Sequence, residues 1–251
     1  MAFFKYSGSN IYFTVKGKGE PVIFIHGNTA SSAMLKSAAR MFSRRFRVVA
    51  LDLPGHGRSD RLQEFPADFW YENAKAVTAL IEYIGHPKAS LVGTSGGALV
   101  ALNAGLQRPD LIDRIVADSF EGEQSAAFYA ETIREEREKG KKNPFLRIFW
   151  RSAHGRNWEG VVDNDSEMIF RHHKEIGRFF HQDLSELKCP VLLTGSLRDE
   201  FIPNIQNIYI PLSEKIKKTR VILFPRGKHP AMLSNAKAFY EIAARFLRDE
   251  M

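Results

Sequence analysis

The chain has 251 residues, of which 44% are hydrophobic and 26% are charged, and its formal net charge is +7. This composition is that of a globular protein with a sizeable core, and no apolar run approaches the roughly 20 residues that span a bilayer. The basic residues are scattered along the chain, which argues against a nucleic-acid surface. A single cysteine, Cys189, excludes an internal disulfide and fits a reducing compartment. We therefore expect a cytoplasmic protein with neither nucleic acid nor membrane as a partner.

Short apolar runs alternate with longer amphipathic segments in the first half of the chain. Residues 3–15 predict a β-hairpin, and the apolar runs "PVIFIHG" and "FRVVALDLPG" that follow are typical of strands buried on both faces. A third run of this kind, "ASLVGTS", ends at Ser95. Amphipathic spacing predicts a helix after each of these three strands. The predicted helices cover residues 31–44, 68–84 and 97–107.

The second half of the chain contains three more strand-like runs and a final predicted helix over residues 230–247. The runs are "IDRIVADS", "PVLLTGS" and "TRVILFP", which bring the number of expected strands to eight with the hairpin included. The alternation predicts an α/β fold with a mostly parallel eight-stranded sheet, flanked by helices on both faces and joined by right-handed crossovers. The hairpin is expected to add antiparallel strands at one edge.

One segment between the strands "IDRIVADS" and "PVLLTGS" carries helical patterns and no strand-like run. One of its helices is expected to begin with Asn143 as N-cap and Pro144 at the first helical position. We expect a helical cap over residues 119–189, inserted into a core domain made of residues 1–118 and 190–251. The cap is expected to select which groups fit the site. Four aromatic residues of this segment are candidates for substrate binding, with packing as the alternative for each: Phe120, Phe145, Phe149 and Trp150.

The stretch "LVGTSGGALVAL" places Ser95 where a strand gives way to a helix. Glycines at Gly93 and Gly97 complete the pattern G-x-S-x-G, which is typical of a sharp turn that exposes a serine at the carboxyl edge of a sheet. The N–H of Gly96 opens the following helix and is expected to point to where negative charge develops in acyl transfer. The alternative is a serine that only caps the helix.

A nucleophilic serine needs a base, and the base needs an orienting acid. Asp199 follows the strand "PVLLTG" and His229 follows the strand "RVILFP", so both stand just past strand ends in the chain order serine, acid, histidine. Asp118 and Glu200 remain alternatives for the acid. Asn28, in the loop after "IFIHG", is the expected source of a second oxyanion N–H.

Other histidines favour structural roles. His56 lies in a turn-rich loop, where glycine and proline set the backbone. His172 and His173 are adjacent, so on a helix they diverge and cannot share a metal ion, which would need a spacing of about one turn. We expect neither a metal site nor a cofactor.

Taken together, these motifs resemble those of the α/β-hydrolase superfamily over essentially the whole chain. The resemblance implies that Ser95 is the nucleophile, His229 the general base and then acid, and Asp199 the orienting carboxylate. It also implies that Gly96 and Asn28 supply oxyanion N–H groups. Gly96 stands where many relatives carry a large side chain, which implies more room or more backbone freedom there. The matching motifs are "HGN", "DLPGHGRSD", "GTSGG", "GSLRDEFIP" and "GKHPAML".

The expected function is that of a capped, cofactor-free serine hydrolase of the esterase or lactonase kind. It would cleave a small, partly apolar carboxylic ester or lactone through an acyl-serine intermediate, acting as a monomer or homodimer on a small-molecule substrate. Two alternatives remain. The chain could be a carbon–carbon bond hydrolase of the same fold, or a triad-containing small-molecule receptor with slow turnover.

Overall fold

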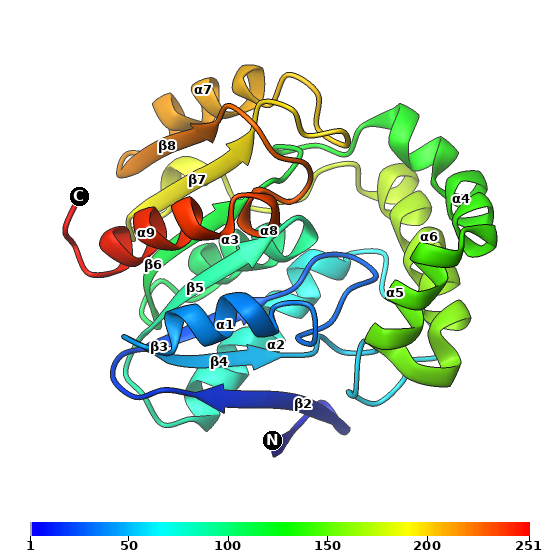
Figure 1. The fold of residues 1–251 in the computed structure, drawn as a ribbon, viewed down its shortest axis with the longest axis horizontal. Coiled ribbons are helices and arrows are strands. Elements are labelled where there is room, and N and C mark those ends of the chain that lie inside the picture. Colours follow the sequence, from blue (N-terminus) through cyan, green and yellow to red (C-terminus); the bar gives the residue numbers. More distant parts are fainter. Residues whose placement is uncertain (1) are drawn as a thin grey trace.

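The computed structural model describes residues 2–251, and within them eight strands form one sheet (Figure 1). The strands lie in the order β1-β2-β4-β3-β5-β6-β7-β8. β1 pairs with β2, and β2 with β4, in antiparallel fashion, whereas all pairs from β4 to β8 are parallel. The expected fold class, a mostly parallel eight-stranded sheet with an antiparallel hairpin at one edge, is confirmed. The bounds are β1 Ala2–Tyr6, β2 Ser9–Lys16, β3 Pro21–Ile25, β4 Arg47–Leu51, β5 Ala89–Thr94, β6 Ile112–Asp118, β7 Val191–Ser196 and β8 Thr219–Phe224.

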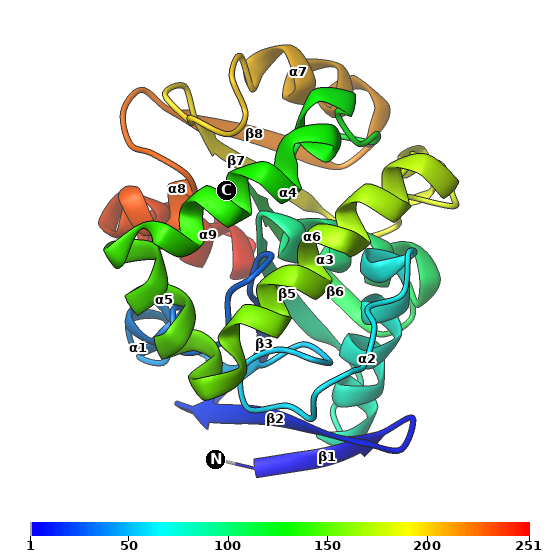
Figure 2. The same cartoon turned by 90° about the vertical axis from the view of Figure 1, so that its right-hand side faces the viewer.

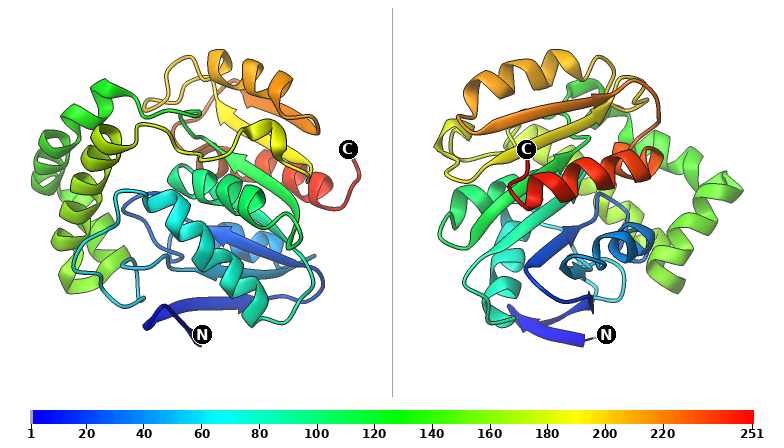
Figure 3. Two further views of the ribbon diagram at one scale, coloured as in Figure 1. Left: turned by 180° about the vertical axis from the view of Figure 1, so that it is seen from behind. Right: turned by 60° about the vertical axis from the view of Figure 1, so that its left-hand side comes forward.

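Helices cover both faces of the sheet, as Figures 1 and 3 show from opposite sides. α1 and α9 pack with the strand residues of one face, and α2, α3 and α7 contribute to the apolar core on the other. β3, β5 and β7 are buried along their whole length, which explains their continuous apolar sequences. The bounds are α1 Lys36–Phe42, α2 Phe69–Tyr83, α3 Gly96–Gln107, α7 Gln206–Lys215, α8 Ala231–Ser234 and α9 Ala236–Leu247.

Two of the expected helices have different bounds in the structure, and one helix is additional. The helix expected over 31–44 begins only at Lys36, because the preceding residues form successive tight turns, and the Ser32 N–H donates to Asp52 Oδ1 at 2.7 Å. The helix expected over 230–247 is divided into α8 and α9 at Asn235. α7 was not expected at all, since Pro211 lies inside it.

Three helices lie between β6 and β7 in the sequence, and we call them the cap helices: α4 Ala127–Lys142, α5 Pro144–His154 and α6 Trp158–Glu175. They lie together beyond the carboxyl ends of the parallel strands (Figures 1 and 2). Asn143 caps α5 as expected, since its side chain accepts from the N–H groups of Phe145 and Leu146. α4 ends at Lys142, directly before this cap residue, and α6 ends at Glu175. No helix within residues 2–251 is long and apolar enough to cross a bilayer.

Candidate active site

Ser95 lies on a strained turn between β5 and α3. Its φ of 55° and ψ of −131° are rare for a residue with a side chain. A Cβ on Gly93 would lie 2.1 Å from the Gly97 carbonyl oxygen, and a Cβ on Gly97 would lie 2.3 Å from the Ile25 carbonyl oxygen. The glycines of the motif are therefore required by close approach of the backbone, which is the reason that the sequence pattern suggested.

The predicted acid and base are in contact. Asp199 lies in the loop after β7, and its Oδ1 accepts from the N–H groups of Phe201 at 3.0 Å and Ile202 at 3.1 Å. Its Oδ2 lies 2.9 Å from His229 Nδ1. Glu200, the other candidate in this loop, accepts instead from the backbone N–H of His229 at 3.0 Å. The carboxylate that can orient the imidazole is thus that of Asp199.

The environment of His229 favours its charged form. Burial by itself would lower the pKa of His229, but the hydrogen bond and the charge of Asp199 more than offset burial, so the pKa lies above its usual value of 6.5. With Nδ1 donating to Asp199, Nε2 is the ring nitrogen left to accept a proton.

Asp118 has a different set of partners. Its Oδ2 accepts from Thr94 Oγ1 at 3.0 Å and from the Met232 N–H at 2.9 Å, and its Oδ1 accepts from Thr194 Oγ1 at 2.8 Å. Burial raises the pKa of Asp118 to about 6 despite these hydrogen bonds. Through these hydrogen bonds the carboxylate joins β5, β7 and the start of α8.

A tight turn follows β3 and runs against the nucleophile elbow. The Ala30 N–H donates to the Gly27 carbonyl at 3.2 Å, which closes this turn. A Cβ on Gly27 would lie only 2.8 Å from Ser95 Cβ, which shows how closely the turn approaches the serine. The N–H of Gly96 begins α3 and has no partner within the helix. We call residues 27–30 the oxyanion loop, although the role of its N–H groups stays a prediction.

Thr29 of the oxyanion loop adopts a φ of 51°, which is rare for a β-branched residue and costs about 1–3 kcal/mol unless its surroundings hold it. Three cap residues do so. Its Oγ1 accepts from Arg137 Nη1 at 2.7 Å and from Trp150 Nε1 at 3.2 Å, and its carbonyl lies 2.9 Å from His154 Nε2. The Gly57 N–H donates to His154 Nδ1 at 3.0 Å, and burial lowers the pKa of His154 to about 4, so Nε2 carries the proton and donates.

A buried carboxylate on α6 holds the neighbouring residue of the same loop. Asn28 Nδ2 donates to Asp165 Oδ2 at 2.8 Å, and Trp70 Nε1 donates to Asn28 Oδ1 at 3.3 Å. Asp165 Oδ1 lies 3.6 Å from Arg137 Nη2. Burial raises the pKa of Asp165, while the charge of Arg137 and the hydrogen bond from Asn28 oppose that shift.

Sequence reasoning missed Arg137, His154 and Asp165, and it named Trp150 only as a candidate for substrate binding. Arg137 and Asp165 are separated from the loop residues that they contact by 108 and 137 positions, so no local motif connects them. The only available signal was that charged residues recur on predicted amphipathic helices, which is typical of any solvated helix face.

The four candidate aromatics lie in different surroundings. Phe120 is fully buried against an aromatic ring of α7, and Trp150 stacks on Trp158 with ring centroids 5.8 Å apart. Phe149 is half-buried beside that pair. Phe145 is 82% exposed on α5. Substrate contact by these four residues stays a prediction.

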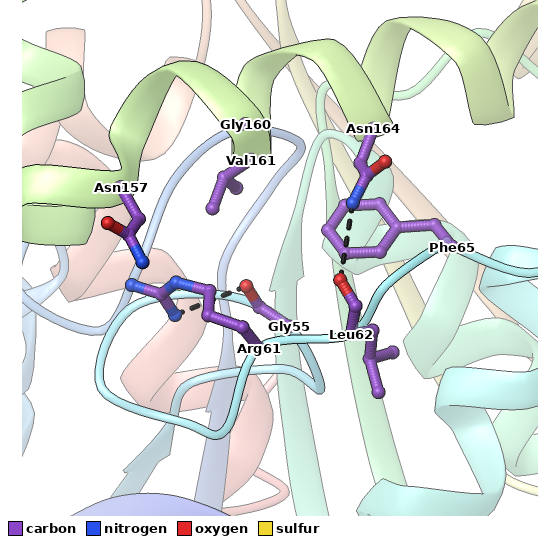
Figure 4. Close-up of a pocket in the computed structure, with 8 residues that line it drawn as sticks. All are labelled: Gly55, Arg61, Leu62, Phe65, Asn157, Gly160, Val161 and Asn164. Atoms are coloured by element: carbon purple, nitrogen blue, oxygen red, sulfur yellow. Dashed lines mark hydrogen bonds between the residues drawn. The ribbon is translucent and has the colours of Figure 1, made fainter.

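A pocket of about 350 Å³ lies between α6 and the loop after β4 (Figure 4). Arg61 projects into it from the loop, and its guanidinium donates to backbone carbonyls, including those of Gly55 at 3.2 Å and His154 at 2.8 Å. On the other side of the pocket, Asn164 of α6 donates to the Leu62 carbonyl at 3.3 Å. These bonds fasten the cap helices to the sheet domain.

Both a family model and the sequences of known proteins match this chain over most of its length. The model of the alpha/beta hydrolase family matches residues 22–242. Serine hydrolase BPHL of Homo sapiens is 27% identical over 256 residues, which cover 96% of this chain and 84% of that protein.

Solved structures share the fold over nearly the whole chain. A meta-cleavage product hydrolase from Pseudomonas fluorescens superimposes with a TM-score of 0.78 at 19% identity, covering 97% of this chain and 96% of that one. An enol-lactonase from Burkholderia xenovorans superimposes with a TM-score of 0.77 at 16% identity, covering 98% of this chain and 99% of that one. The match to the family model extends across both the sheet and the cap helices, and the chain therefore belongs to the alpha/beta hydrolase family and is a hydrolase.

Proposed function

We propose that the chain cleaves a small carboxylic ester or lactone through an acyl intermediate on Ser95, with His229 and Asp199 completing a triad. The observation that carries this proposal is the 2.9 Å contact between Asp199 Oδ2 and His229 Nδ1. Asp199 lies in the loop after β7 and His229 in the loop after β8. Both loops are at the sheet edge where the strained turn presents Ser95. A nucleophile, a base and an orienting acid at one edge are the groups that acyl transfer requires.

In the first step, Ser95 Oγ attacks the carbonyl carbon of the substrate and passes its proton to His229 Nε2. The carbonyl oxygen becomes an oxyanion, which the N–H groups of Asn28 and Gly96 stabilise. The intermediate then collapses, the bond to the leaving alkoxide breaks, and His229 returns the proton to that oxygen. Asp199 stabilises the imidazolium meanwhile, in keeping with the raised pKa of His229.

In the second step, a water molecule replaces the leaving alcohol. His229 Nε2 takes a proton from it, and the resulting hydroxide attacks the acyl carbon. The bond to Ser95 Oγ breaks, the serine recovers its proton from His229, and the carboxylic acid is released. No redox or metal step enters this sequence.

Labelling with a fluorophosphonate tests the nucleophile. We expect one label per chain, on Ser95, and loss of both the label and ester turnover in Ser95→Ala, with Ser119→Ala as a matched control. Recovery of the label on another serine of the folded protein would contradict the assignment.

A substrate panel tests the reaction class. It should contain p-nitrophenyl esters of increasing chain length, lactones, thioesters and a dienone with a vinylogous carboxylate. Steady multiple turnover of the esters or lactones supports the proposal. A single slow turnover that leaves acyl-Ser95 in place would instead indicate a receptor.

Carbon–carbon bond hydrolysis is the second candidate, because the meta-cleavage product hydrolase shares the fold over nearly the whole chain. Preference for the dienone over every ester of similar size would favour this candidate. Both reactions would use Ser95 and His229, so the panel and not the labelling separates them.

A further inference from the structure

We propose that Asp165 on α6 is a positioning residue for the oxyanion loop: it holds the Asn28 side chain over Gly96 and thereby directs the Asn28 N–H. The inference rests on the proposed function, because it assigns that N–H to acyl transfer. It also gives the cap a part in the rate of the reaction, beyond the selection of substrates.

The first support is that both ends of the Asn28 amide are held. Nδ2 donates to Asp165 at 2.8 Å and Oδ1 accepts from Trp70 at 3.3 Å. A side-chain amide fixed at both ends restricts the backbone that carries it, including the N–H of the same residue. This N–H is the one to which the proposed function assigns contact with the oxyanion.

The second support explains the glycine after the nucleophile. A Cβ on Gly96 would lie 1.8 Å from Asn28 Oδ1 and 2.8 Å from Trp70 Nε1. The space expected to be open beside Gly96 is therefore filled by the Asn28 side chain. Gly96 and the anchored Asn28 fit together, and each restricts what the other position can carry.

The third support is the placement of Asp165 on a helix that is bonded to the core loops. The side chain of Asp165 is 0% exposed, with Arg137 Nη2 at 3.6 Å from Oδ1. The preceding residue, Asn164, donates to the carbonyl of Leu62 at 3.3 Å (Figure 4) and to that of Gln63 at 3.2 Å. α6 thus bridges two core loops through adjacent residues: Asn164 bonds to the loop after β4, and Asp165 bonds to Asn28 of the oxyanion loop.

This arrangement predicts a specific kinetic signature. Misdirecting one oxyanion donor costs about 10²–10³ in kcat, because the bond is made to charge that develops in the transition state. Ground-state binding depends little on that bond, so KM should change by less than about threefold. A merely structural role of Asp165 would lower the melting temperature without this split between kcat and KM.

The experiment compares three variants on the smallest ester that the wild type hydrolyses. Asp165→Ala should lose about 10² in kcat, and Asp165→Asn, which keeps an oxygen acceptor for the Asn28 amide, should recover at least about tenfold of that loss. Asn164→Ala is the matched control on the same helix, and its kcat should stay within about threefold of the wild type. Equal kcat losses in Asp165→Ala and Asn164→Ala would overturn the proposal.

A double-mutant cycle extends the test. Asn28→Ala should lose kcat as Asp165→Ala does, and the double variant should lose little more, because both changes release the same N–H. Additive losses, or full kcat in Asn28→Ala, would overturn the proposal. If Asp165→Ala does not fold, Asn28→Ala and Asp165→Asn carry the test in the same way.

The test also separates this inference from the proposed function. Ser95→Ala should abolish turnover. Retained turnover in Ser95→Ala would refute the acyl-Ser95 mechanism, and the positioning role with it. Loss of turnover in Ser95→Ala with normal kcat in Asp165→Ala would refute the positioning role alone.

Discussion

The carboxyl edge of the sheet and the cap helices contribute to the site in different ways. The sheet edge supplies the groups proposed to react, Ser95, Asp199 and His229, each in a loop or turn that follows a strand. The cap supplies groups that hold backbone, since Arg137, Trp150 and His154 all bind Thr29. Reacting groups can therefore be placed by short local motifs. The loop that faces them is held by residues that come from a distant part of the chain.

The largest expected effect tests the sheet edge. Asp199→Asn should lower kcat by about 10⁴, because the amide favours the wrong tautomer of His229. Asp118→Asn is the control, and its kcat should fall by less than about tenfold, since Asp118 bonds to Thr94, Thr194 and Met232 instead of the imidazole. Steady-state kinetics of both variants provide the measurement. The reverse ranking would move the acid to Asp118.

The next effect tests the hold of the cap on Thr29. Thr29→Ala removes the acceptor for Arg137 and Trp150, so the strained loop should relax and kcat should fall about 10- to 100-fold. Thr29→Ser keeps the oxygen and lacks the β-branch, and it should remain close to the wild type. Equal kcat values for the two variants would mean that the cap does not hold the loop through this oxygen.

A smaller effect concerns pH. Since His229 must be neutral to accept the serine proton and its pKa is raised, kcat/KM should fall as the pH drops through a midpoint above 6.5. Removing the charge in Asp199→Asn should move the midpoint of the residual activity downward, because Asp199 is the main group that raises this pKa. A pH–rate profile gives both midpoints. An unchanged midpoint would assign the acidic limb to another group.

The smallest effect is confined to the cap. Asn143→Ala removes the side-chain cap of α5 and should cost about 1 kcal/mol of stability, seen as a lower melting temperature. The kcat of the folded variant should be unchanged, because Asn143 does not contact the oxyanion loop. A fall in kcat at temperatures well below melting would show that the outer end of the cap is coupled to the site.

Much of the sheet domain could be predicted because its signals are local. Buried parallel strands read as continuous apolar runs, and α2 and α3 were located to within a residue by their apolar spacing or the glycines before them. Errors arose where local signals were overridden. The Ser32 N–H donates to Asp52 and lies in a turn ahead of α1, so this helix starts later than expected. α7 forms although it contains Pro211.

The sequence by itself determined the elbow and the list of candidates for the triad. Strand ends and close backbone approach leave few residue types that fit, as at Gly93 and Gly97. Only the tertiary structure decided which carboxylate meets His229, because Asp118 and Asp199 both stand at strand ends and differ in what packs around them. It also decided the setting of Asn28, whose partner Asp165 lies 137 positions away, since burial of a charge is a property of the folded chain.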